Sequence, residues 1–197
     1  MSKLPFSFII CIILLQTCMA GELSENKEPA GNLSKTVVLT FDDAPKSHLT
    51  FVAPLLKKMG FNATFFITYE WMDDEENFMS WDHVAELHKM GFEIGNHAWH
   101  HWNFSQPKTA AALEGELGLI NYELQRQGIP MPVSFAWDGN GFGPEAVRVL
   151  DNLGYQFARR GKQREMAYGT LEPGPGFDPT EHHHLLIPTT CDGYPDL

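Results

Sequence analysis

The chain has 197 residues, of which 43% are hydrophobic and 20% charged, and its formal net charge at pH 7 is −11. This composition is that of a globular protein and excludes a disordered tail, a collagen and a coiled coil. The excess of acidic residues argues against binding to the phosphate backbone of nucleic acid. A nucleic-acid partner is therefore not expected.

The first twenty residues have the pattern of a secretory signal peptide. Lys3 precedes an apolar run at residues 4–15, which is too short to span a bilayer. Cys18 and Ala20 place small residues at the −3 and −1 positions of a signal-peptidase site, which predicts cleavage after Ala20. Lipoprotein cleavage before Cys18 is the alternative, but the two residues before it are unfavourable there. We expect a secreted or periplasmic protein whose mature chain has no membrane span.

The mature chain is expected to contain one domain. Residues 21–34 are rich in Gly, Pro, Asn and Ser, which predicts a flexible lead-in before a domain at residues 35–197. Cys191 is the single cysteine left after cleavage, so no disulfide can form within the mature chain. Its stability must come from a packed core.

Short β-rich segments alternate with amphipathic helices along the domain. The expected strands are residues 36–41, 63–67, 92–95, 132–137 and 155–158. The expected helices run over about residues 51–59, 80–90, 107–127 and 144–153, each followed by a glycine. Short strands separated by helices pair in parallel through right-handed crossovers, which predicts an α/β sheet or barrel. In both architectures the functional side chains gather at the carboxyl ends of the strands.

Side chains typical of a metal site follow two of the expected strands. Asp42 and Asp43 follow the first strand, and His97 and His101 follow the third. Two imidazoles and one carboxylate predict a three-ligand site with an open position for water, as in catalytic zinc sites. A structural zinc site would need four ligands, and a zincin motif would need Glu where Ala98 stands. We therefore expect a divalent metal ion, with zinc as the expected element.

Three short motifs occur in an order that resembles a known family. They are TFDD at residues 40–43, ATFF at residues 63–66 and GNHAWHH at residues 95–101. Over about residues 36–160 the chain resembles the polysaccharide deacetylase family, the NodB-homology carbohydrate esterases. The resemblance implies a distorted (β/α) barrel and a metal-dependent hydrolase that removes acetyl groups from sugars.

The resemblance also implies a role for each site residue. Asp42 matches the catalytic base of the family, and Asp43, His97 and His101 match its metal ligands. Asp42 would accept a proton from a water that the metal activates, and the metal would stabilise the oxyanion. Because successive side chains of an extended strand diverge, two neighbouring carboxylates can serve these two roles.

The chain departs from the family pattern in three places. Ala98 stands where Ser or Thr usually follows the first motif histidine. The segment FAWDGN at residues 135–140 lacks the Arg that orients the catalytic base, since Ala136 stands in the matching segment. The last family motif carries a His that serves as general acid, and no such segment precedes Leu197. We therefore expect the barrel to lack its C-terminal part.

Other aromatic and histidine residues have alternative interpretations. Four tryptophans follow expected strands, and Trp99 and Trp137 are the predicted sugar platform, with local core packing as the alternative. The run His182 to His184 precedes an apolar segment at residues 185–187, which favours a solvated loop leading into a strand.

Two functions from different classes fit these residues. The first is a secreted metal-dependent hydrolase acting on an acetylated carbohydrate of the chitin-oligomer, peptidoglycan or acetylxylan type. The second is a catalytically impaired relative that binds carbohydrate or has a structural role. Ala136 and the missing last motif favour the second function. The intact set of Asp42, Asp43, His97 and His101 favours the first, because a decayed enzyme should lose its ligands early.

Overall fold

The structure is a computed structural model that describes residues 37–161 and 183–189. The predicted signal peptide and lead-in lie outside the described residues. Residues 162–182 and 190–197, on which the expected absence of a last motif partly depends, also lie outside them. Within the described ranges, no helix has the length and apolar character that a membrane crossing requires.

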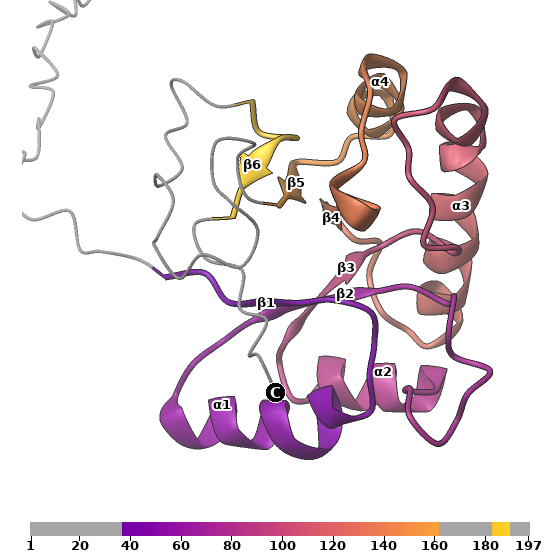
Figure 1. The fold of residues 1–197 in the computed structure, drawn as a ribbon. Coiled ribbons are helices and arrows are strands. Elements are labelled where there is room, and N and C mark those ends of the chain that lie inside the picture. The colour runs from indigo at the N-terminus through magenta and orange to yellow at the C-terminus, as the bar shows by residue number, and fades with distance from the viewer. Residues whose placement is uncertain (1–36, 162–182, 190–197) are drawn as a thin grey trace, which may run out of the picture. The chain divides into compact units, whose positions relative to one another are not determined.

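Strands and helices alternate along the described chain, as the sequence predicts (Figure 1). The strands are β1 (Thr40–Phe41), β2 (Thr64–Ile67), β3 (Glu93–Asn96), β4 (Ser134–Ala136), β5 (Phe157–Arg160) and β6 (Ile187–Pro188). The α-helices are α1 (Ala53–Met59), α2 (Trp81–Lys89), α3 (Pro107–Arg126) and α4 (Pro144–Asn152). A π-helical turn, η1 (His48–Val52), leads into α1, and a 3-10 turn, η2 (Asp138–Asn140), follows β4.

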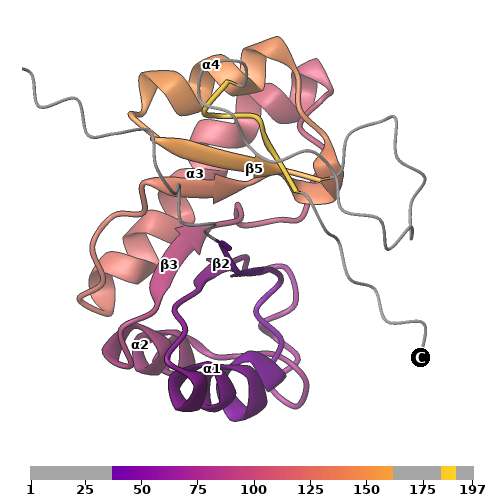
Figure 2. The same cartoon turned by 90° about the vertical axis from the view of Figure 1, so that its left-hand side faces the viewer.

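The six strands form one parallel sheet in the order β1-β2-β3-β4-β5-β6. Helices connect the first five strands in succession, and Figures 1 and 2 show them on the outer side of a curled sheet. This arrangement is a half-barrel of strands covered by helices. It confirms the predicted α/β class and the distorted (β/α) barrel type.

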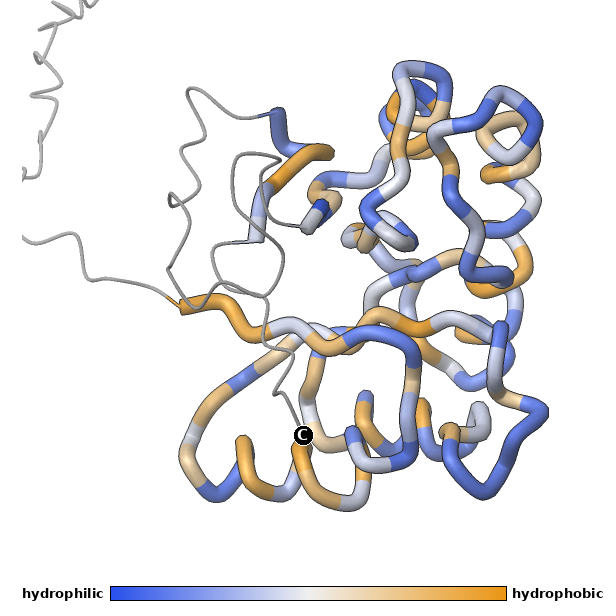
Figure 3. Tube along the Cα trace, viewed as in Figure 1, coloured by the Kyte–Doolittle hydropathy of each residue, from blue (hydrophilic) through white to orange (hydrophobic). Residues whose placement is uncertain are grey.

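Two apolar clusters fill the space between the sheet and the helices. The first joins β2 and β3 to α1 and α2 and includes Phe65, Ile67 and Leu87. The second joins β4 and β5 to α3 and α4 and includes Leu117 and Phe135. The connection from β2 to α2 is by contrast largely hydrophilic, as the blue tube in Figure 3 shows. The two clusters therefore hold the strands against the helices.

The predicted helix boundaries agree with the observed caps. Gly60 ends α1 in the left-handed conformation, with φ of 74°, which a residue with a Cβ adopts only at a cost. Ser80 caps α2 in a capping box with the His83 side chain. Gly60 thus marks the end of α1, and Ser80 marks the start of α2.

Candidate metal centre

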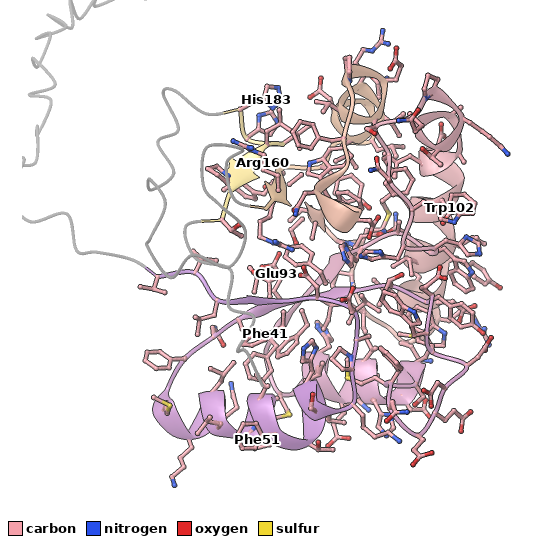
Figure 4. The ribbon with its side chains drawn as sticks, viewed as in Figure 1. Phe41, Phe51, Glu93, Trp102, Arg160 and His183 are labelled. Atoms are coloured by element: carbon pink, nitrogen blue, oxygen red, sulfur yellow. The ribbon has the colours of Figure 1, made fainter. Side chains whose placement is uncertain are left out.

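The carboxyl ends of β1, β3, β4 and β5 bring six polar side chains to one edge of the sheet. Figure 4 shows the side chains as sticks and labels Phe41 and Arg160, the sequence neighbours of two of the six. The six residues are Asp42 and Asp43 after β1, His97 and His101 after β3, Asp138 after β4, and Arg159 in β5.

The three expected metal ligands come together at this edge. The Oδ1 atom of Asp43 lies 3.4 Å from Nε2 of His97 and 3.7 Å from Nε2 of His101. One ligand atom from each of the three residues lies within 4.8 Å of the other two. Ligand atoms about 2 Å from a common zinc ion have separations of this size. The Asp43–His97–His101 cluster can therefore hold one ion with little rearrangement.

Unusual backbone conformations direct these side chains inward. Asp43, Ala44 and Ala98 have φ values of 71°, 55° and 56°, in the left-handed region that non-glycine residues rarely occupy. Such strain persists where surrounding contacts enforce it, often at functional sites. One such contact is the 2.8 Å hydrogen bond from the Ala98 N–H to Oδ1 of the buried Asn96. The sequence interpretation gave Asn96 no role, but it holds the loop that carries both histidines.

His97 is buried with its Nδ1 atom 2.8 Å from the carbonyl oxygen of Ala136. A hydrogen bond from Nδ1–H to this carbonyl leaves Nε2 facing Asp43 as a ligand atom. Burial lowers the pKa of His97, but the carboxylates of Asp138, Asp43 and Asp42 more than offset this and raise the pKa to about 9. Without metal, His97 therefore carries a proton on both ring nitrogens at neutral pH and is positively charged.

His101 is half-buried and is held by the loop after β2. Its backbone N–H donates to Oε2 of Glu70 over 3.1 Å, and its ring centroid lies 5.1 Å from that of Trp71. Burial and the neighbouring His97 lower the pKa of His101, although Asp43 and Glu70 act in the opposite direction. A neutral imidazole is the form that binds a metal ion.

The environment of the Asp43 carboxylate favours binding of a cation. Burial raises the pKa of Asp43, but the adjacent imidazoles of His97 and His101 outweigh this and lower it. Its buried Oδ1 atom has no hydrogen-bond partner of good geometry within the described part of the chain. A buried carboxylate oxygen without a partner is costly, and a bound cation removes that cost. The residues present therefore fit a divalent ion.

Zinc binding is expected to release protons and to strengthen with pH. A metal ion at Nε2 must displace the proton of His97, so apparent affinity should rise about tenfold per pH unit between pH 7 and 9. Calorimetry at pH 7 in two buffers of different ionisation enthalpy measures the release, which we expect to be about one proton per ion. Equal heats in both buffers would contradict the assigned state of His97.

Asp42 forms an ion pair with Arg159. The Arg159 Nη2 atom donates to Oδ2 of Asp42, and both side chains are largely shielded from solvent, with 14% and 31% exposed. The guanidinium also lies over the ring of Phe66, 5.7 Å from its centroid. The ring of Phe66 fits because Gly95 has no side chain, since a Cβ there would lie 2.3 Å from the ring. Arg159 thus contacts both the ring of Phe66 and the carboxylate of Asp42.

No role was assigned to Arg159 from the sequence alone. The family's Arg is absent at Ala136, but Arg159 is the direct neighbour of Ala136 in the β4–β5 register. A guanidinium from the adjacent strand therefore reaches the carboxylate of Asp42. The sequence feature that could have indicated this role is a basic residue at the carboxyl end of the strand that follows the segment lacking the family's Arg.

Trp137, one of the two tryptophans of the predicted sugar platform, is buried in the core. Trp137 is only 2% exposed, and its indole N–H donates to the Leu185 carbonyl over 2.8 Å in the second apolar cluster. This placement corrects the expectation that Trp137 lines a sugar-binding surface. Its side chain faces the helices because side chains alternate along β4 and its continuation.

Trp99 and Trp71 lie closer to the ligand loop. Trp99 is half-buried and stacks on Tyr69, with ring centroids 4.1 Å apart, so its contact with a sugar stays a prediction. Trp71 is half-buried against the ring of His101. An aromatic ring in contact with a ligand side chain is well placed to meet the apolar face of a sugar.

Two other histidine groups do not join the cluster. His48 is buried between the rings of Phe41 and Phe65, each 5.4 Å away, and burial lowers its pKa to about 4 although Asp42 and Asp43 act against this. It packs as a neutral group behind the Asp42–Asp43 turn. His183 and His184 are exposed and precede β6, as expected for a loop that leads into a strand, whereas His182 lies outside the described residues.

The sequence profile of the polysaccharide deacetylase family matches residues 30–158. The chain belongs to the polysaccharide deacetylase family. The matched segment contains β1 to β4 and α1 to α4, and with them Asp42, Asp43, His97, His101 and Asp138. No curated protein matches the chain significantly.

Several solved structures have a similar fold. The Streptococcus pyogenes deacetylase PplD in complex with acetate has 18% identity and a TM-score of 0.64, over 85% of this chain and 67% of that one. A de-N-acetylase from Aggregatibacter actinomycetemcomitans has 18% identity and a TM-score of 0.60, over 80% and 72%. BA3943, a CE4-family pseudoenzyme from Bacillus anthracis, has 22% identity and a TM-score of 0.55, over 64% and 43%. At these identities the similarity shows a shared fold.

Proposed function

We propose that this polysaccharide deacetylase family member is a secreted, metal-dependent hydrolase that removes acetyl groups from an acetylated glycan. The observation that carries the proposal is the Asp43–His97–His101 cluster beside the Asp42–Arg159 ion pair, at the sheet edge where (β/α) folds place their chemistry. Family membership supports the reaction class, and the predicted signal peptide supports export to where glycans occur.

Each side chain of this site has its own role in the proposed reaction. Asp43, His97 and His101 would hold a divalent ion, which when bound supplies a Lewis acid for the acetyl carbonyl and lowers the pKa of water. Asp42 accepts the proton of the attacking water as general base. Arg159 fixes the orientation of the Asp42 carboxylate through a charge-assisted hydrogen bond. The hydrogen bond to Ala136 keeps Nδ1 of His97 away from the ion.

A pocket of about 300 Å³, lined by the loops that follow three of the strands carrying the site, supports a carbohydrate substrate. Its lining combines amide, hydroxyl and guanidinium groups with one aromatic ring, a mixture that suits the hydroxyls and apolar faces of a sugar. The lining residues come from the loops after β3, β4 and β5 and are Asn103, Ser105, Gly139, Asn140, Gly141, Phe142, Arg160 and Gly161. The proposal places a sugar unit of the glycan in this pocket.

A carbohydrate-binding relative without turnover is the second candidate. The fold similarity to a Bacillus anthracis pseudoenzyme favours it, since this fold persists without activity in that protein. The Asp42–Arg159 ion pair argues for the enzyme, because binding alone does not require an oriented carboxylate beside the ligand cluster.

Acetate release from a panel of acetylated glycans tests the proposal. N-acetylated chitin oligomers, peptidoglycan and acetylxylan would each be incubated with the zinc-loaded protein, with and without a chelator. We expect acetate from at least one glycan and none after chelation. Glycan binding without acetate release from any member of the panel would instead support the second candidate.

Replacing Arg159 should slow the reaction without removing the metal. Arg159→Ala leaves the Asp42 carboxylate without its partner, so we expect kcat/KM to fall about 10- to 100-fold. Arg159→Lys keeps the charge but loses the planar guanidinium, and an intermediate loss is expected. Arg148→Ala is the matched control, since Arg148 is 70% exposed on α4. Unchanged turnover in Arg159→Ala would show that the ion pair has no catalytic role.

A further inference from the structure

Asp138 is a fully buried carboxylate that the proposed reaction does not use. It begins the η2 turn directly after β4, and it is 0% exposed. Both of its carboxylate oxygens are without a well-aligned hydrogen-bond partner within the described part of the chain. Removing a carboxylate from water costs several kcal/mol unless a nearby positive charge offsets the loss. The position therefore needs a physical explanation.

The two histidine ligands lie close to the carboxyl group of Asp138. Its Oδ1 atom lies 3.0 Å from Nδ1 of His97 and 4.0 Å from Nε2 of His101. Asp43 contacts His97 from the opposite side, through Nε2. The ring of His97 thus lies between two carboxylates, one at the ligand nitrogen and one at the other ring nitrogen.

A carboxyl group beside the second ring nitrogen strengthens the bond of a histidine ligand to its metal ion. A carboxylate at the non-ligating nitrogen fixes the orientation of the ring and increases its electron donation to a metal ion. The single Nδ1–H of His97 points to the carbonyl of Ala136, and the carboxyl group of Asp138 lies beside the same nitrogen. Burial raises the pKa of Asp138, and positive charge at the ring of His97 acts in the opposite direction and favours the carboxylate form.

We propose that Asp138 is a positioning residue of the metal centre, whose buried carboxyl group beside Nδ1 of His97 strengthens binding of the ion. The proposal rests on the proposed metal site but not on the deacetylation reaction. It is therefore tested by measuring metal binding, so that failure of this proposal can be distinguished from failure of the proposed function.

A role in the metal centre and a role in folding alone predict different zinc affinities for Asp138→Asn. The amide keeps the shape but removes the charge. If Asp138 serves the ion, zinc affinity should fall 10- to 100-fold. If Asp138 serves folding alone, the folded protein should keep its zinc affinity. The melting temperature of the metal-free protein does not separate the two roles, because the change also removes a group that lies 3.0 Å from the protonated ring of His97.

Competition with a chromophoric chelator measures zinc affinity, and thermal melting of the chelated protein measures metal-free stability. Glu116→Gln is the matched control, because Glu116 is a buried carboxylate that contacts His100 of the same loop, 3.1 Å from its Nδ1. That variant should melt earlier with zinc affinity within threefold of wild type.

Asp138→Ser is the second variant and should also weaken zinc binding, which keeps the test decisive if the amide does not fold. Zinc affinity within twofold of wild type in a folded Asp138 variant would overturn the proposal. Absence of zinc binding by the wild-type chain would instead overturn the proposed function.

Discussion

The Asp42→Asn variant should lose acetate release almost completely while its zinc content stays near that of the wild type. The amide cannot accept the proton of the attacking water, and loss of a general base typically costs 10²- to 10⁴-fold in rate. The Asp42 carboxylate pairs with Arg159, whereas the Asp43 carboxylate faces both imidazoles. We therefore expect Asp43→Asn to lose both zinc and turnover.

Elemental analysis of the two purified variants, beside acetate release at saturating glycan, measures both quantities. Asp151→Asn is a suitable control, because Asp151 is an exposed residue of α4. Equal zinc content in Asp42→Asn and Asp43→Asn would show that the two neighbouring carboxylates do not divide the roles of base and ligand.

Replacing the histidine ligands should remove the ion altogether. His101→Ala is the cleaner change, because His101 is half-buried while His97 is buried among strand ends. We expect zinc to fall from one ion per chain to background, and the melting temperature to fall to that of the chelated wild type. A ligand at 100 times its Kd stabilises the folded state by about 2.7 kcal/mol, so the shift is measurable.

His100→Ala provides the control in the same loop. His100 stacks on Trp102 and contacts Glu116, and neither of its contacts belongs to the ligand cluster. This variant should keep its zinc, and chelation should lower its melting temperature as in the wild type. Full zinc occupancy in a His97→Ala, His101→Ala double variant would refute the site.

The fold and the ligand cluster follow from local sequence signals. Helix periodicity with glycine exits predicts the alternation, and parallel pairing then gathers Asp43, His97 and His101 at one edge. These inferences need the knowledge of which residues end a strand, whereas the choice of Asp43 over Asp42 as the ligand came from the resemblance to the family. They are reliable because the carboxyl ends of parallel strands meet at the same edge.

The residues that sequence reasoning missed depend on strand register and on side-chain direction. Arg159 reaches Asp42 because it lies beside Ala136 in the β4–β5 register, and no local pattern shows that pairing. Trp137 faces the helices because side chains along β4 alternate between the two faces of the sheet. Its position directly after a strand does not show which face it takes. Asp138 was read as part of a motif without its Arg, while its contact with His97 depends on how β3 and β4 lie together.

The most direct test of a metal-dependent deacetylase is acetate release from one glycan while zinc is returned stepwise to the metal-free protein. The account predicts that the rate rises in proportion to bound zinc, levels off at one ion per chain, and stays at background in zinc-loaded Asp42→Asn. A rate that is the same before and after zinc is returned would contradict it. So would a fully loaded wild-type protein that releases no acetate from any acetylated glycan.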